Sequence, residues 1–167
     1  MEIRKLTQND LEQYKKIRLE GLKNNPLFFG SSFEEEKAMN INLWLNKITE
    51  NNDHCSFGLF VSNKLISLIT LNFETREKRK HCINITSVIT KQEFQNKGYA
   101  SLLFKETLSF IDNLKKYTNL TLKVGENNIN AINLYKKFGF IETGKDINTI
   151  FYNNNYYSLI TMQKIIR

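Results

Sequence analysis

The chain has 167 residues, of which 41% are hydrophobic and 25% are charged, and it carries a formal net charge of +7. One proline and no low-complexity linker leave no domain boundary to place, so we expect a single domain over residues 1–167. No apolar run reaches the length of a membrane span and the N-terminus has no apolar signal segment, which predicts a cytoplasmic protein without a membrane partner. The positive charge fits an anionic cofactor or a nucleic acid, and equally a solvated basic surface.

The first fifty residues favour helices. Thr7, with Asp10 three residues later, resembles a helix N-cap with an acidic third position. Pro26 ends the first helix because proline disfavours helical backbone in the residue before it. Ser32 with Glu35 forms a capping-box pattern that begins a short helix. The expected elements are a strand over residues 2–6, a helix to about residue 24, a short helix from residue 32 and a helix over 41–50.

From residue 55 onward strands dominate. Ser62-Asn63-Lys64 is typical of a tight hairpin turn, and Gly139 of a helix C-terminus. The simplest interpretation of the basic cluster 76–81 is an exposed hairpin loop, since the cluster lacks the interleaved aromatic residues of a nucleic-acid-binding surface. Cys55 and Cys82 fall within expected strands and are typical of buried thiols in a reducing compartment. The expected strands are 55–61, 65–73, 81–90, 120–124, 140–151 and 156–166, with helices from about residue 99 and over 128–138.

The resulting order is β-αα-βββ-α-β-α-ββ, which predicts an α+β or mixed α/β fold with helices on the faces of one sheet. Two histidines and two cysteines without metal-ligand spacing predict no zinc site and no other metal.

The most informative stretch joins the strand 82–90 to the helix that follows it. Gly98 has no Cβ, so a phosphate could approach its backbone, and Ala100 is small. Backbone N–H groups at a helix N-terminus have no partner within the helix, and the helix dipole favours an anion there. Lys97 adds a positive charge beside this helix start. Taken alone, the stretch is either a phosphate-binding turn or an ordinary helix entrance.

A second candidate site lies on the helix 128–138. Asn128, Ala131 and Tyr135 fall on one helix face, where the small residue leaves space between an amide and a phenol. The phenol could donate a proton and the amide could bind a polar chain. Taken alone, Tyr135 is more often a half-buried core aromatic residue, and Asn128 is more often an N-cap.

Together the two stretches resemble the GCN5-related N-acetyltransferase (GNAT) superfamily. The first, Gln95-x-x-Gly98-x-Ala100, is similar to the family's acetyl-CoA pyrophosphate loop. The second, Asn128-x-x-Ala131-Ile132-x-Leu134-Tyr135-x-Lys137-x-Gly139-Phe140, resembles its C-terminal motif. The resemblance implies a mostly antiparallel sheet of about seven strands that splays at the acetyl-CoA site, and no metal.

The resemblance also implies roles for individual residues. Acetyl-CoA would be the co-substrate, Tyr135 the general acid for the departing thiolate, and a backbone N–H near residues 88–90 the donor to the carbonyl oxygen. The residues implied in cofactor binding are Val88, Ile89, Thr90, Gln95, Asn96, Lys97, Gly98, Tyr99, Ala100, Ser101, Asn128, Tyr135 and Lys137.

The general base is not identified by the sequence. Relatives that act on ribosomal-protein N-termini often carry a glutamate where this chain has Lys123, which puts that base and that substrate in question. Glu35 is the candidate base, although helix capping with a solvated charge is the commoner role for a glutamate at this position. Residues 26–32 resemble an acceptor-side loop whose aromatic residues could shape the acceptor pocket.

The expected activity is direct transfer of an acetyl group from acetyl-CoA to a primary amine. The acceptor is open among polyamines, amino acids, antibiotics, peptide N-termini and protein lysines. A non-catalytic acyl-CoA sensor on the same fold is the alternative, and a nucleic-acid binder is supported only by the cluster 76–81. No nucleic-acid partner is expected, and a homodimer is possible because relatives are often dimers.

Overall fold

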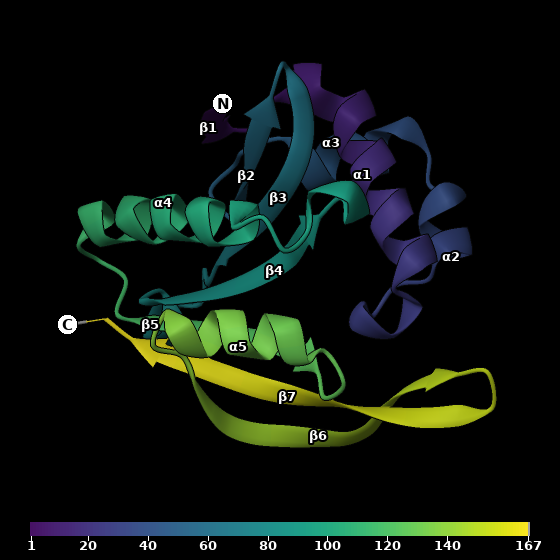
Figure 1. The fold of residues 1–167 in the computed structure, drawn as a ribbon. Helices are drawn as coiled ribbons and strands as arrows, with labels where there is room; N and C mark the ends of the chain where they lie inside the picture. The colour runs from purple at the N-terminus through teal and green to yellow at the C-terminus, as the bar shows by residue number, and fades with distance from the viewer. Residues whose placement is uncertain (167) are drawn as a thin grey trace.

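The computed structural model describes residues 1–166, which form seven strands and five α-helices (Figure 1). The strands are β1 (Glu2–Lys5), β2 (His54–Val61), β3 (Lys64–Phe73), β4 (Cys82–Thr90), β5 (Asn119–Gly125), β6 (Ile141–Tyr152) and β7 (Asn155–Ile165). The helices are α1 (Leu11–Asn24), α2 (Phe33–Lys37), α3 (Ile41–Ile48), α4 (Tyr99–Leu114) and α5 (Ile129–Lys137).

All seven strands belong to one sheet in the order β1-β2-β3-β4-β5-β7-β6. Every neighbouring pair is antiparallel except β4 and β5, which run parallel. The expected mixed fold is therefore confirmed. Three α-helices separate β1 from β2, at the three places that the sequence predicted, although the predicted order β-αα-βββ-α-β-α-ββ shows only two of them. Ser32 and Glu35 form the capping box that begins α2.

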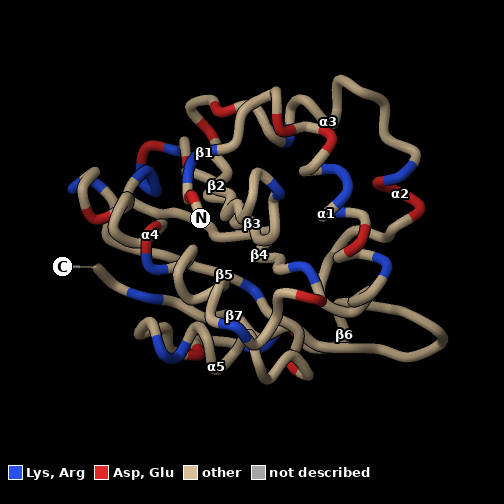
Figure 2. The backbone as a smooth tube through the Cα atoms, turned by 45° about the horizontal axis from the view of Figure 1, so that its top comes forward, with Lys and Arg blue, Asp and Glu red and all other residues tan. Residues whose placement is uncertain are grey.

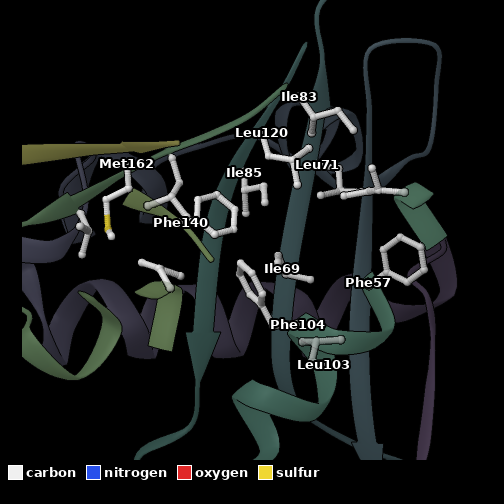
Figure 3. Close-up of a cluster of buried hydrophobic side chains, with 14 of the residues drawn as sticks. Phe57, Ile69, Leu71, Ile83, Ile85, Leu103, Phe104, Leu120, Phe140 and Met162 are labelled. Atoms are coloured by element: carbon white, nitrogen blue, oxygen red, sulfur yellow. The ribbon is translucent and has the colours of Figure 1, made fainter. Parts of the chain in front are cut away.

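Each face of the sheet carries its own apolar core. Under α4 and α5, Phe104 and Phe140 pack with side chains of the central strands, as Figure 3 shows. On the other face, Tyr14 and Ile17 of α1 and Trp44 of α3 cover β2, β3 and the end of β4. Gly21 of α1 lies so close to β4 that an added Cβ would stand 3.2 Å from Ile89. The two helical layers thus hold the end of β4 from both sides.

The hairpin turns agree with the turn residues of the sequence. Ser62–Asn63 and Asn153–Asn154 have positive φ values between 47° and 61°, as the two central residues of a tight hairpin turn require. The β6–β7 hairpin extends beyond the rest of the sheet in Figure 1, and most of β6 is exposed. Cys55 and Cys82 are buried free thiols, as expected.

Charged residues of both signs are interspersed along the chain in Figure 2. The cluster 76–81 is exposed, and Arg76 pairs with Glu74 at 2.9 Å, so part of its positive charge is compensated. Across residues 1–166, none of the helices combines the length and the apolarity needed to cross a membrane.

Candidate active site

The site begins where two parallel strands separate. The pairing of β4 with β5 ends at Ile85 and Leu122, although β4 continues to Thr90 and β5 to Gly125. Beyond that point β4 pairs only with β3, and β5 only with β7. A cavity of about 510 Å³ opens between the diverging ends, a volume in the usual range for small-molecule sites. Among residues 1–166, no strand pairs with the edges of β4 and β5 that face this cavity.

A β-bulge bends β4 at the same place. Its register with β3 shifts between the pairs Thr70–Thr86 and Leu68–Ile89, so two residues of β4 oppose one of β3. Ser87 has a φ of 52°, which is uncommon for a residue other than glycine. Both residues of the bulge, Ser87 and Val88, line the cavity.

The N-terminus of α4 forms a second wall. Gly98 is its N-cap with a φ of 81°, and Asn96 has a φ of 59°. In the first hydrogen bond of the helix, the N–H of Leu102 donates to the carbonyl of Gly98 at 3.0 Å. The N–H groups of Tyr99, Ala100 and Ser101 precede this first intrahelical donor, so they have no acceptor within the helix. They lie at the end of the helix dipole that favours an anion. A Cβ built on Gly98 would meet no protein atom within 4 Å, so this surface is open to a ligand.

Gln95 and Lys97 stabilise the turn between β4 and α4. The side chain of Gln95 donates to the carbonyl of Thr90 at 3.0 Å, and the ammonium of Lys97 donates to the carbonyl of Glu93 at 2.9 Å. Gln95 lines the cavity, whereas Lys97 lies outside its wall, over the ring of Phe94. The amide of Gln95 thus joins the end of the strand to the helix entrance.

Helix α5 forms the opposite wall. Asn128 is its N-cap, and its side-chain oxygen accepts from the N–H of Ala131 at 3.2 Å. Tyr135 lies one turn further along at 5% exposure, with its ring against Phe104 and Phe140. Burial raises the pKa of Tyr135 well above its usual value, so this phenol keeps its proton. Asn128, Ala131 and Tyr135 all line the cavity, as their spacing on one face requires.

Aromatic residues and one lysine complete the cavity on the side of α1 and α2. Phe28 belongs to a short 3₁₀ turn, Pro26–Phe28, and Phe29 follows it. Gly125 allows the close approach of this turn, because an added Cβ would lie 3.3 Å from the carbonyl oxygen of Leu27. Lys123 is the charged residue of the lining, and its ammonium pairs with Asp146 of β6 at 2.5 Å.

Most of the site residues expected from the sequence meet in this one cavity. Lys137 is exposed on α5 and, like Lys97, lies outside the wall. Glu35 is also outside it: its carboxylate accepts from the N–H of Ser32 at 2.7 Å, and this bond lowers its pKa. The expected residues that line the cavity are Val88, Ile89, Thr90, Gln95, Asn96, Gly98, Tyr99, Ala100, Ser101, Asn128 and Tyr135.

Sequence reasoning missed Ser87 and Asn25, which also line the cavity. A positive φ at a serine leaves no sequence signature, because serine is common in ordinary strands and turns. Asn25 directly precedes Pro26, where the sequence was interpreted only as the end of the first helix. The likeness of residues 26–32 to an acceptor-side loop is a signal that could have indicated this neighbouring asparagine.

Comparison with known proteins agrees with this geometry. The model of the acetyltransferase (GNAT) family matches residues 19–140. The chain belongs to this family.

Individual members differ widely from it in sequence. An L-amino acid N-acetyltransferase, AaaT, of Escherichia coli K12 is 22% identical over 123 residues, which cover 74% of this chain and 75% of the relative. A spermidine N(1)-acetyltransferase of Vibrio cholerae is 26% identical over 163 residues, which cover 94% of this chain and 91% of that relative. The crystal structure of a probable acetyltransferase from Staphylococcus epidermidis superposes with a TM-score of 0.81 at 18% identity, covering 99% of both chains.

The residues present fit the acetyl-CoA that this family uses. The free edge of β4 offers backbone groups to an amide-containing arm, as an added strand would. The α4 N-terminus and the open surface at Gly98 suit a diphosphate. The lining therefore offers groups that suit the arm and the diphosphate of such a donor.

Proposed function

We propose that this protein is an acetyl-CoA-dependent N-acetyltransferase that moves the acetyl group directly to a primary amine within a ternary complex. One observation carries the proposal: the free edge of β4, the N-terminus of α4 and the buried phenol of Tyr135 face the same 510 Å³ cavity. This combination matches a thioester donor that has an amide-containing arm and a diphosphate. When bound, acetyl-CoA supplies the activated acetyl group.

The chain's own groups then have distinct tasks. N–H groups at residues 98–101 hold the diphosphate, and the edge of β4 at residues 88–90 holds the arm. A backbone N–H at the Ser87–Val88 bulge stabilises the negative charge that develops on the acetyl oxygen. Tyr135 would donate its proton to the departing thiolate, and the proton that the attacking nitrogen loses as the amide forms would restore the phenol through solvent. Asn128 keeps α5 in register as its N-cap, and this places Tyr135 at the cavity wall.

The acceptor must lose a proton before it attacks, because an alkyl amine with a pKa near 10.4 is mostly protonated at neutral pH. Glu35 is held at the α2 N-terminus, away from the cavity lining, so its position does not support a direct role as base. Transfer of the proton to water at the cavity mouth is the simplest route that this geometry allows.

The decisive experiment measures free thiol released from acetyl-CoA across a panel of amines, with mass spectrometry of the acetylated product. The panel holds L-amino acids, spermidine, a peptide with a free N-terminus and a lysine-containing peptide blocked at its N-terminus. Acceptor-dependent thiol release supports the enzyme. Thermal stabilisation by acetyl-CoA and CoA without turnover on any amine would favour the acyl-CoA sensor instead, and no stabilisation by either would remove cofactor binding.

The cytoplasmic location and the homodimer expected from the sequence remain proposals. Sedimentation with and without CoA tests the second, since a dimer has twice the 19.7 kDa mass of the chain.

A further inference from the structure

An ion pair is buried between α1 and α2, next to the acceptor-facing side of the cavity. The guanidinium of Arg18 donates twice to the carboxylate of Glu36, at 3.0 and 2.7 Å. The side chain of Glu36 is fully buried and that of Arg18 is 8% exposed. Lys47 of α3 approaches the same carboxylate at 3.4 Å, so Glu36 gathers cations from two helices. The result is a bidentate pair shielded from solvent.

Stability does not explain such a pair. Removing two charges from water is costly, and apolar residues of similar volume often stabilise a protein as well or better. The desolvation of Glu36 opposes its charge, and the bonds from Arg18 nevertheless lower its pKa. A pair that gains little stability calls for another role.

The remaining contacts of Arg18 point to the cavity. Its Nη1 donates to the hydroxyl of Ser87 at 3.5 Å, and its guanidinium lies 4.9 Å from the centre of the Phe29 ring. Ser87 and Phe29 both line the cavity, one on β4 and the other after the α1 helix, whereas Arg18 itself lies behind them. One guanidinium thus connects two parts of the cavity wall that are far apart in sequence.

Ser87 needs such support because its backbone is strained. Its φ of 52° is unfavourable for a residue with a side chain and persists only where the surroundings enforce it. Hydroxyl bonds fix β4 on either side of the bulge: Thr86 accepts from Asn72 at 2.8 Å, and Ser67 donates to the carbonyl of Ile89 at 2.9 Å. At the bulge itself, Arg18 is the partner of the Ser87 side chain.

We propose that Arg18, held by Glu36, is a positioning residue that fixes the Ser87 bulge and the Phe29 ring relative to each other. The pair acts from behind the wall and touches neither substrate. It sets the direction of the Val88 N–H and the width of the acceptor side. The effect of the Arg18–Glu36 pair on catalysis rests on the proposed acetyltransferase activity, whereas its effect on the Ser87 bulge does not.

The test replaces both charges with apolar residues of similar volume, as Arg18→Met together with Glu36→Met, so that neither charge is left buried alone. The matched control is Arg76→Met with Glu74→Met, which removes an exposed bidentate pair at the other end of β3 and β4. Hydrogen–deuterium exchange at residues 86–90, acetyl-CoA affinity by calorimetry, and kcat and KM are measured for each protein.

In the Arg18/Glu36 variant we expect amide exchange at residues 87–89 to accelerate at least tenfold and kcat to fall at least tenfold. The Kd for acetyl-CoA should rise by a smaller factor than kcat falls, because the edge of β4 holds only the arm and the α4 N-terminus, which holds the diphosphate, is untouched. The control should match the wild type in every measurement. Exchange within twofold of the wild type, or a loss of acetyl-CoA affinity as large as the loss of kcat, overturns the proposal.

A second variant, Ser87→Ala, removes the hydroxyl that Arg18 contacts and leaves the ion pair intact. If the double variant does not fold, accelerated exchange at residues 87–89 in Ser87→Ala supports the proposal, and unchanged exchange overturns it. If the wild type acetylates no amine, the proposed function fails, while the exchange measurements still decide whether Arg18 holds the bulge.

Discussion

Ile85 and Leu122 are the last residues that β4 and β5 pair with each other, and the cavity begins directly beyond them. Parallel strands normally continue side by side, so their separation leaves two unpaired backbone edges. Such edges cost free energy unless water or a ligand satisfies their polar groups. Here the bulge at Ser87 and the short β4–β5 register create the opening, and α4 and α5 close its sides.

Gly98→Ala should weaken acetyl-CoA binding about tenfold or more. Gly98 has a φ of 81°, so an alanine there costs about 1–2 kcal/mol of backbone strain. Its Cβ would also project from the surface proposed to receive the diphosphate. Calorimetric titration with acetyl-CoA measures the affinity, and urea unfolding measures the stability.

The control for this change is Gly144→Ala on β6, where an added Cβ likewise meets no atom within 4 Å. It should alter neither affinity nor stability by a measurable amount. Unchanged acetyl-CoA affinity in Gly98→Ala would contradict the diphosphate site at α4.

Tyr135→Phe should lower kcat about 10- to 100-fold, because it removes the proposed proton donor. The acetyl-CoA Kd should stay within threefold, since the ring and its contacts with Phe104 and Phe140 remain. Tyr117→Phe is the matched control: Tyr117 is equally buried, at 7% exposure, but stacks on Phe73 away from the cavity. A Tyr135→Phe enzyme with wild-type kcat would exclude the phenol as the acid.

The pH dependence of turnover tests the same residue independently. Burial raises the pKa of Tyr135, so its acid form persists beyond the usual phenol pKa of about 10. The acceptor amine gains reactivity as pH rises. We therefore expect kcat/KM to increase with pH up to about 10 without a descending limb. A descending limb below that pH, absent from Tyr135→Phe, would show that the phenol titrates normally.

Tyr14 should make the fold sensitive to alkali. Burial raises its pKa to about 12, whereas the unfolded chain releases this proton near pH 10. The stability that the raised pKa contributes is fully present below pH 10 and is lost as pH rises toward 12. Urea unfolding at pH 9, 10 and 11 should show a fall in the free energy of unfolding to which Tyr14 contributes about 1.4 kcal/mol, so the fall should be smaller by that amount in Tyr14→Phe. Tyr156→Phe, at 63% exposure, should keep the wild-type slope.

Lys123→Glu should shift the acceptor preference toward polycations. Lys123 places a positive charge at the cavity wall, and a glutamate there attracts an amine with further positive charges. The ratio of kcat/KM for spermidine to that for an L-amino acid should rise about fivefold or more. The matched control is Lys136→Glu. Lys136, like Lys123, pairs with a carboxylate of β6, but it lies outside the cavity lining, so this substitution should leave the ratio unchanged. An unchanged ratio in Lys123→Glu would remove this residue from acceptor selection.

Local patterns predicted much of the molecule. The Ser32–Glu35 capping box, the Asn128 N-cap and the turn at Ser62 depend on residues close together in the chain, and the structure contains all three. Helix starts and tight turns are satisfied by neighbouring side chains or by particular φ values, so their residues mark them directly.

The glutamates of α2 show what local patterns do not predict, namely which of two neighbouring side chains is buried. Glu35 and Glu36 are neighbours, and the sequence favoured Glu35 as the candidate base. Successive helical residues point about 100° apart, so one glutamate caps the helix at the surface while the other is buried against Arg18. Which glutamate faces inward depends on where α1 lies, and that is a property of the packed molecule.

The sequence by itself determined the order of elements, the glycine turn at α4 and the face shared by Asn128, Ala131 and Tyr135, because each depends on spacings within one element. Only the tertiary structure decided that β4 and β5 separate after Ile85, that Ser87 takes a positive φ, and that Arg18 reaches it across 69 residues of chain. Contacts of that range arise from the packing of helices on a sheet, and no local periodicity records them.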